Sequence, residues 1–496
     1  MISAFFLIPA IAGLISFFLK NDKIRRTLLV ITAVLHSLLT IYSWFNRPEP
    51  FFNQWLILDN LGLLFLSITS IIFLAVSFYS VGYLAKERHT HIDFEENVFF
   101  TNASEAVFTG CMLLFLATMS LVTISNNFGL IWVAVEASTL ASAPLIYFHR
   151  HHRSLEATWK YLMICSVGIA LALLGNFLLA VSLPEKIDEA TFLNLNQMVL
   201  QASALKLVYL KTAFIFFIVG YGTKMGLAPM HTWLPDAHSE APSAVSALLS
   251  GALLNCSFLG ILRAYQVCNA AGLGSFCKDL FIILGLLSMA IATIFIMRQV
   301  DYKRMLAYSS IEHMGILTLG VGLGGAATFG SMLHTINHSL TKAMLFLVAG
   351  NILSVYKTKR ISDIKGVLKL IPVSGTLWLA GFLSITGFPP FGTFLSEFTI
   401  LKGALEQGYF AVAVIYLILL ALIFIGMSIN VLGMSHGNIP ESKSLAITYE
   451  NLNVSETWFT IVPPAILGVM ILFLGLYLPK ELTVFFQSIT ETLGVP

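Results

Sequence analysis

Two ionisable side chains of this sequence lie inside apolar segments, where a charge is costly. Lys224 ends the run FIFFIVGYGTK, and Glu136 follows six consecutive apolar residues. A charged side chain near the centre of a bilayer costs roughly 2.5–3.5 kcal/mol on insertion scales, so such residues usually belong to an ion or proton pathway. Desolvation favours a neutral carboxyl group unless a cation holds it ionised, and Lys224 is the expected cation for Glu136. We predict a proton-carrying pair; a structural ion pair or a protonated, hydrogen-bonded glutamic acid is the alternative.

A second polar group falls in the run SMLHTINHSLTKAMLFLVAG, where His334, His338 and Lys342 are spaced by four residues. On a helix this spacing offsets successive side chains by about 40°, so the three share one face. Histidine titrates near neutral pH and a buried lysine can do so too, which favours a proton relay over a purely structural polar stripe. Two histidines at this spacing could also bind a metal. No HExxH motif or acidic third ligand accompanies them, so we expect no metal here.

Glu397 follows a glycine- and proline-rich interruption, Gly387–Gly392, and is expected to lie at the end of the polar line. The alternative is an interfacial acid near a helix end. Lys402 and Glu406 lie closer to the end of the same segment and are predicted to be surface groups.

Several further residues are secondary candidates for the same pathway. Lys211 could line the route by which protons arrive, or its amine could snorkel to the membrane interface. The stretch after Pro229 is predicted to be a turn or half-helix through which protons are taken up. Arg298, Lys303 and Arg304 are expected to be ordinary anchors. The secondary candidates from these segments are Lys211, His231, Glu312 and His313, and the uptake stretch also holds Asp236, His238 and Glu240.

The composition is that of a membrane protein. Hydrophobic residues make up 57% of the 496 and charged residues only 11%, whereas soluble domains carry about 25% charge. A formal net charge of +2 gives no reason to expect a nucleic-acid partner. The cysteines form no CxxC pair and are expected to be buried as small hydrophobic residues; they are Cys111, Cys165, Cys256, Cys268 and Cys277.

The apolar segments predict an all-α polytopic fold with about 14 transmembrane helices, since each segment approaches the 20 or so residues that a span needs. Lysine and arginine are concentrated in alternate loops, which places those loops in the cytoplasm and both termini outside it. The expected spans are 2–19, 26–45, 57–84, 105–124, 128–148, 157–182, 207–226, 242–267, 278–297, 303–322, 325–355, 371–400, 408–434 and 458–479.

Two of these segments are interrupted, near Gly226–Pro229 and at Gly387–Gly392. A broken helix at membrane depth is tolerated only where its free backbone groups meet protein or a water-filled cavity. Breaks at matching places in two halves are typical of inverted-repeat transporters, and here they fall in the seventh and twelfth predicted helices. The expected division is 1–104 for helices one to three, 105–270 for a first five-helix repeat, 271–435 for a second, and 436–496 for a loop, the last helix and the tail.

Three runs of the sequence resemble a known family: KMGLAPMHTWLPDAHSEAPSAVSALLSG, DYKRMLAYSSIEHMG and LHTINHSLTKAMLFLVAGNI. They closely resemble signatures of the antiporter-like membrane subunits of respiratory complex I and membrane-bound hydrogenases. The run WVAVEASTLASAPLIYFHRHHRSLEATWKYLMICSVGIALALLG looks more particularly like component F of hydrogenase-4. The resemblance implies fourteen helices with two inverted five-helix repeats. It also implies proton-transfer roles for Glu136, Lys224, His334, His338, Lys342 and Glu397.

One position departs from this pattern. The family often has a lysine or histidine in the middle of helix eight, where this sequence has Asn255. An amide cannot carry a proton as a charge, so the central link is expected to run through water that Asn255 orients.

The predicted function is proton translocation along the central line of buried Glu, Lys and His residues, within a hydrogenase-4 or complex-I-like redox complex of the inner (plasma) membrane. No flavin, nucleotide, haem or iron–sulfur motif occurs in the sequence, so we expect no cofactor in this chain and electron transfer in other membrane and soluble subunits. Three alternatives remain: a sodium/proton antiporter module, the membrane subunit of an inorganic-carbon uptake system with a soluble zinc-binding partner, and a scaffold that moves nothing.

Overall fold

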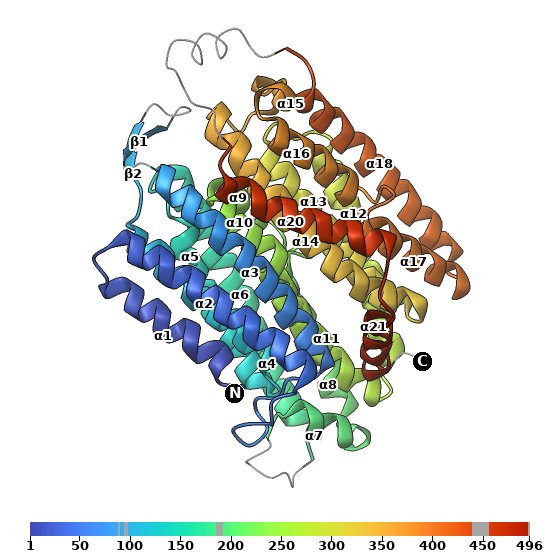
Figure 1. The fold of residues 1–496 in the computed structure, drawn as a ribbon. Coiled ribbons are helices and arrows are strands. Elements are labelled where there is room, and N and C mark those ends of the chain that lie inside the picture. The colour runs from blue at the N-terminus through green and yellow to red at the C-terminus, as the bar shows by residue number, and fades with distance from the viewer. Residues whose placement is uncertain (88–89, 94–97, 185–191, 439–455, 495–496) are drawn as a thin grey trace.

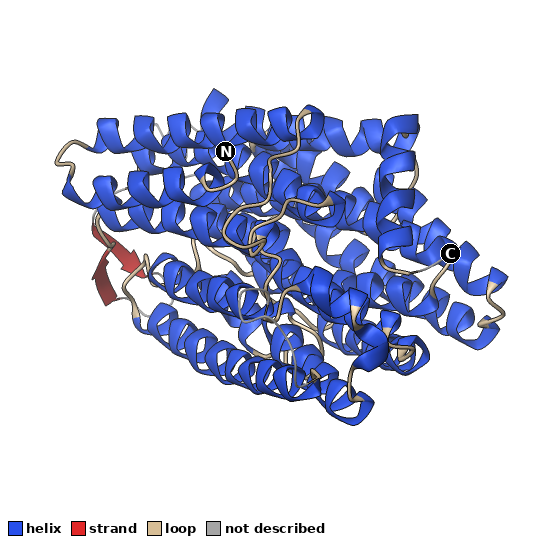
Figure 2. Cartoon of the chain, turned by 90° about the horizontal axis from the view of Figure 1, so that it is seen from below, coloured by secondary structure: helices blue, strands red, loops and turns tan. Residues whose placement is uncertain are grey.

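The computed structural model describes residues 1–496 apart from 88–89, 94–97, 185–191, 439–455 and 495–496. The described chain is mostly helical, and its helices lie side by side in one bundle (Figure 1). This confirms the predicted class of a helical polytopic membrane protein. A short antiparallel hairpin, β1 (Thr90–Asp93) and β2 (Val98–Thr101), was not predicted, and it lies at one end of the bundle (Figure 2).

The first half of the chain, up to residue 270, contains the first break. Its helices are α1 (Ala4–Phe18), α2 (Asp22–Phe45), α3 (Asn60–Lys86), α4 (Glu105–Ile124), α5 (Phe128–Ile146), α6 (His152–Ser182), α7 (Leu195–Leu200), η2 (Ala202–Ala204), α8 (Leu207–Met225), α9 (Trp233–Glu240), α10 (Ser243–Leu248), the π-helical η3 (Leu249–Leu253) and α11 (Leu254–Ala270).

The second half begins after α11 and contains the second break. Its helices are α12 (Gly274–Ile296), α13 (Tyr302–Leu323), α14 (Ala326–Tyr356), η4 (Ile361–Asp363), α15 (Val367–Leu370), α16 (Pro372–Ile385), α17 (Gly392–Glu406), α18 (Phe410–Ser435), α20 (Trp458–Leu476) and α21 (Lys480–Thr492).

Eleven helices of the described residues are long and apolar enough to cross a membrane. The predicted segments that fall outside this group are α1, which is short, α13, and the interrupted pair α16 and α17. The outer helices expose large apolar side chains such as Ile429 and Val469, whereas the span from Ser243 to Ala270 is buried except at its last two residues. This distribution suits a bundle whose rim faces lipid and whose centre does not.

Helix α8 ends where the sequence predicts a break. Gly226 has a φ of 86°, a left-handed conformation that glycine adopts without a steric penalty. The N–H groups of Gly226 and Leu227 both donate to the carbonyl of Gly222, at 2.9 and 2.8 Å, and so cap the last turn. Lys224 therefore lies in the final turn of α8, beside the break.

The second break separates α16 from α17, and Gly387 within it also has a positive φ of 63°. Helix α14 packs against α10 and η3, which follow the first break in the chain, and against α16 and α17, which flank the second. The helix that carries the histidine row therefore borders the second interruption directly.

Away from the centre, a buried ion pair joins α11 to the start of α3. Arg263 is fully buried, and its two terminal nitrogens donate to the two carboxylate oxygens of Asp59 at 2.6 Å each. Asp59 also caps α3 by accepting from the Gly62 N–H at 2.8 Å. Burial alone would raise the pKa of the Asp59 carboxyl, but Arg263 and the backbone donor lower it below its ordinary value.

Replacing Asp59 by alanine is expected to destabilise the fold by about 3 kcal/mol, since it leaves a buried guanidinium unpaired. Thermal unfolding of the detergent-solubilised chain measures this. Asp22→Ala is the control, because the Asp22–Arg25 pair is more exposed and such pairs contribute about 0–1 kcal/mol. The stabilisation by Asp59 should be present at neutral pH and fade as pH falls through the lowered pKa. Equal effects of the two variants would contradict the prediction.

Candidate functional site

Lys224 is completely buried and is held by hydroxyl groups. Its Nζ donates to Thr139 Oγ1 on α5 at 2.7 Å and to Tyr161 OH on α6 at 2.6 Å. The Tyr161 hydroxyl also shares a hydrogen bond of 2.6 Å with Ser142 Oγ. Both partners are neutral hydroxyl groups, which can accept a hydrogen bond from the amine whether it is charged or neutral. The sequence alone did not indicate that Tyr161 belongs to this site, because it contacts Lys224 from a different helix.

Glu136 is joined to Lys224 through Thr139 and not by a direct ion pair among the described contacts. Thr139 Oγ1 lies 3.3 Å from Glu136 Oε2, and Ser166 Oγ donates to Oε1 at 2.9 Å. Glu136 is only half-buried, and on the same helix Val133 and Leu140 are exposed. The carboxyl group therefore lies between the buried lysine and the side of the bundle.

Lys342 forms a second buried amine site in the other half of the chain. Its Nζ donates to the Leu306 carbonyl at 2.7 Å and to Ser309 Oγ, both on α13. Glu312, also buried on α13, interacts with it electrostatically. The structure thus places Glu312, a secondary candidate, beside the lysine at the end of the predicted histidine row.

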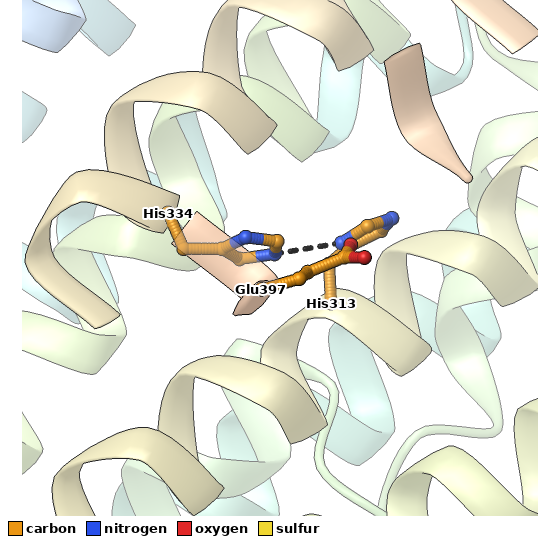
Figure 3. A group of neighbouring side chains, drawn as sticks. All are labelled: His313, His334 and Glu397. Carbon is orange, nitrogen blue, oxygen red and sulfur yellow. Dashed lines mark hydrogen bonds between the residues drawn. The ribbon is translucent and has the colours of Figure 1, made fainter. Parts of the chain in front are cut away.

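Three helices bring two histidines and a glutamate together (Figure 3). His313 Nδ1 on α13 lies 2.8 Å from His334 Nε2 on α14, and the two rings are stacked. Glu397 from α17 joins them, since the ligand atoms of all three lie within 4.8 Å of one another. No acidic third ligand was expected for the pair His334 and His338. The structure instead groups His334 with His313, and α17 brings Glu397 to them across the second break.

Glu397 is buried, with 6% of its surface exposed, so it is not the interfacial acid of the alternative interpretation. Its carboxyl group occupies the space beside Gly387, where a β-carbon would lie only 1.9 Å from Oε2. Glycine at this position therefore makes room for the carboxyl group. Lys402 and Glu406, in contrast, are exposed, as predicted, and they pair with each other at 3.5 Å.

Asn255 lies on α11 immediately after the π-helical turn. Its Nδ2 donates to Ser339 Oγ on α14 at 2.6 Å and to the Gly251 carbonyl at 2.8 Å, while Oδ1 is buried without a protein partner among the described residues. One free acceptor aimed into the bundle suits the predicted role of orienting water between the two lysine sites.

Lys303 corrects one sequence expectation. It was predicted to be an ordinary anchor, yet it is buried, and its Nζ donates to the backbone carbonyls of Ala241 at 2.6 Å and Ser239 at 3.2 Å. Carbonyls freed at the end of α9 accept these bonds, and helical periodicity could not reveal that. Glu240, next to them, forms an ion pair of 2.7 Å with Lys359.

His238 connects this ionic group to Lys342. It lies on α9, is fully buried, and stacks on Phe346 of α14 at 4.9 Å. It interacts electrostatically with both Lys342 and Lys303, and neither of its ring nitrogens has a hydrogen-bond partner in the described part of the chain. From the sequence, His238 is one of several residues of the predicted uptake stretch and has no distinguishing feature.

Two secondary candidates are not brought into the cluster. Lys211 is exposed on α8 and lies over the ring of Phe276 at 5.5 Å, which favours the snorkelling interpretation. His231 is buried at the break, where its ring meets Tyr308 edge-on at 6.4 Å.

Several residues of the site have buried polar atoms that lack a protein partner among the described residues. They are His238, Asn255, Glu312, His313, Asn337, His338 and Glu397. Buried polar groups in folded proteins are nearly always hydrogen-bonded, and ordered water supplies the partner where protein does not. These atoms are therefore places where internal water can bind.

The sequence signature of one family matches residues 125–423, a stretch that contains all the groups described above. That family is described as the transmembrane region of NADH:quinone oxidoreductase and Mrp antiporter subunits. The chain belongs to this family.

Other members of the NADH:quinone oxidoreductase/Mrp antiporter family resemble it over most of their length. A hydrogenase-4 component F homolog from Methylacidiphilum infernorum is 35% identical over 82% of this chain and 84% of its own. A subunit N of NADH-quinone oxidoreductase from Desulforudis audaxviator is 30% identical over 70% of this chain and 69% of its own. Among solved structures, a chain of an archaeal membrane-bound sulfane sulfur reductase superposes with a TM-score of 0.85 at 18% identity, covering 99% of this chain and 97% of that one.

Proposed function

We propose that this chain is the proton-translocating membrane subunit of a hydrogenase-4 or complex-I-like redox complex. The observation that carries the proposal is the set of buried ionisable groups that includes Lys224, Lys342 and Glu397, accompanied by buried polar atoms without protein partners among the described residues. A protein without a transport role rarely keeps several charges at membrane depth, because each one is costly there.

Two proton-handling units are proposed, each beside a broken helix. The first consists of Glu136, Thr139 and Lys224, in which the threonine hydroxyl bridges the carboxyl group and the amine. Protonation of Glu136 removes a negative charge near Lys224 and favours loss of the lysine proton, since opposite charges stabilise each other's ionised forms.

The second unit receives protons through the end of the bundle that holds α9. Glu240 and Lys359 lie at its outer end, Lys303 and His238 follow, and Lys342 lies deeper. From Lys342, protons pass by Glu312 and the paired imidazoles to Glu397. His338 can take part, since its ring lies 5.2 Å from that of His313. Asn255 and water connect the two units.

The predicted arrangement in the membrane belongs to the same proposal. It comprises fourteen spanning helices, with residues 1–104 preceding two inverted repeats, 105–270 and 271–435, and residues 436–496 following them. Both chain ends lie at the end of the bundle that holds α7, opposite the β1–β2 hairpin and α15 (Figure 1). We place this end outside the cytoplasm of a cell whose inner membrane holds the complex.

The energy for transport comes from partner subunits in this proposal. Moving one charge against 100 mV requires roughly 2.3 kcal/mol, and electron transfer in neighbouring subunits is the proposed source. We propose that the chain itself holds no cofactor. The half-buried carboxyl group of Glu136, at the side of the bundle, is where a neighbouring subunit could alter the charge balance.

A cation/proton antiporter is the second candidate function. The observation that favours it is similarity to Na⁺/H⁺ antiporter subunits A1, with 27% identity to that of Staphylococcus haemolyticus over 90% of this chain. A membrane subunit of an inorganic-carbon uptake complex remains the other alternative. Sodium-dependent transport, or co-purification with a soluble zinc-binding protein in place of redox subunits, would favour one of these.

The test is proton pumping by the purified complex in liposomes, followed with a pH-sensitive dye. Lys342→Met is expected to reduce pumping by roughly 100-fold, the scale at which a lost proton-transfer group lowers rates. Lys402→Met, which alters an exposed lysine, is the matched control. Pumping that is unchanged in Lys342→Met would contradict the proposed route, and sodium transport in place of proton transport would support the antiporter.

A further inference from the structure

The cluster of His313, His334 and Glu397 has the donor atoms of a transition-metal site. Two imidazoles and one carboxylate are a ligand set that Zn²⁺ uses, with a fourth position left for another ligand. The three side chains come from α13, α14 and α17, and their ligand atoms lie within 4.8 Å of one another in a buried position (Figure 3).

The hydrogen bonds around His334 orient its ring for metal binding. Ser396 Oγ donates to the Thr393 carbonyl at 2.8 Å, so it accepts from His334 Nδ1 at 2.9 Å. The proton of a neutral ring is then on Nδ1, and the lone pair of Nε2 faces His313. Metal-binding histidines are commonly fixed in this way by an outer hydrogen-bond partner.

His313 and His334 would have to move apart only slightly to bind one metal ion together. His313 Nδ1 and His334 Nε2 lie 2.8 Å apart with one proton between them. Two nitrogens bound to a tetrahedral metal at about 2.0–2.1 Å each lie about 3.3 Å from one another. An opening of about half an ångström therefore suffices for this pair. The proton between the two rings, which His313 carries on Nδ1, must then move to His313 Nε2 so that Nδ1 can bind the metal.

Charge also favours a cation here. Glu397 Oε1 is buried and unpaired within the described structure, and a buried carboxylate without a counter-charge is costly. Glu312 is a second buried carboxyl group close enough to interact with Glu397. His338 lies nearby, with its ring 5.2 Å from that of His313, but it is not among the three residues whose ligand atoms lie within 4.8 Å of one another.

We propose that His313, His334 and Glu397 form a binding site for a transition-metal dication such as Zn²⁺, which leaves a fourth coordination position open. The bound ion holds the imidazoles and the carboxylate without the protons that they would otherwise exchange. If the proposed proton route is correct, on which this consequence rests, the ion blocks transport.

Binding is tested with Co²⁺ as the probe, because four-coordinate Co²⁺ absorbs visible light strongly. The full chain in lipid nanodiscs is expected to bind one Co²⁺ with this absorption, and Zn²⁺ should displace it. Both His334→Gln and Glu397→Gln should abolish the absorption. Ser396→Ala should weaken binding by roughly 10–100-fold, as loss of an outer hydrogen-bond partner does. Size-exclusion profiles confirm that each variant remains folded.

The histidines of the loop before α6 are the competing explanation. His149, His151 and His152 lie near the surface and could bind ions adventitiously. The triple variant H149Q/H151Q/H152Q should retain the Co²⁺ absorption. Loss of absorption in that variant, or its persistence in both His334→Gln and Glu397→Gln, would overturn the proposal.

The effect of Zn²⁺ on pumping tests the metal site and the proposed proton route independently of each other. Inhibition that His334→Asn relieves, in whatever pumping that variant retains, supports both. Co²⁺ binding to the cluster without any inhibition by Zn²⁺ would support the metal site and contradict the proton route through it.

Discussion

Alanine in place of Lys224 is expected to stop proton pumping by the complex, with a loss of roughly 100-fold or more. The Lys224 amine donates to both Thr139 and Tyr161, and no other lysine reaches these hydroxyls among the described contacts. Without it, Glu136 loses the amine to which Thr139 links it. Proton uptake into liposomes that contain the complex, measured together with electron transfer, gives the result.

Two further variants test whether Lys224 carries protons or only stabilises the fold. Lys224→Arg keeps a positive charge but cannot release a proton near neutral pH, so it should fold and still fail to pump. Lys211→Ala removes an exposed lysine from the same helix and should pump normally. A pumping Lys224→Arg variant would show that the residue serves as a fixed charge.

Glutamine in place of Glu397 is the second change with a large expected effect. It preserves the shape of the side chain beside Gly387 but removes the carboxyl group from the cluster that Glu397 forms with His313 and His334. Protons that reach His334 then lack their next acceptor, and we expect pumping to fall by roughly 100-fold. The same liposome assay measures it.

Glu406→Gln is the matched control, since Glu406 lies on the same helix but is exposed and paired with Lys402. It should leave pumping and thermal stability unchanged. Normal pumping by Glu397→Gln, with Lys224→Ala inactive, would mean that protons leave the line before α17.

Much of the fold could be predicted because its signals are local. Apolar length marks the helices, and glycine and proline mark both breaks, at Gly226 and Gly387. The spacing of His334, His338 and Lys342 placed them on one buried helical face, as the structure has them. Asn255 was recognised as a departure from a resembling family, and its free Oδ1 agrees with that interpretation.

Contacts between helices could not be predicted in this way. Lys303 was misassigned because its burial depends on the carbonyls of Ser239 and Ala241, which lie about sixty residues earlier. Tyr161 is likewise separated from Lys224 by 63 residues, and Glu397 from His334 by about as many. Helical periodicity states which face a residue occupies but not which helix meets that face.

The sequence by itself therefore determined the class of the protein, the depth of its charges and the places where its helices break, because hydropathy and backbone preference act over a few neighbouring residues. The tertiary structure alone decided which charges meet: a threonine hydroxyl lies between Glu136 and Lys224, and α17 brings a carboxylate to two histidines. Those encounters follow from the packing of whole helices, in which the burial of many apolar side chains sets the position of a few polar ones.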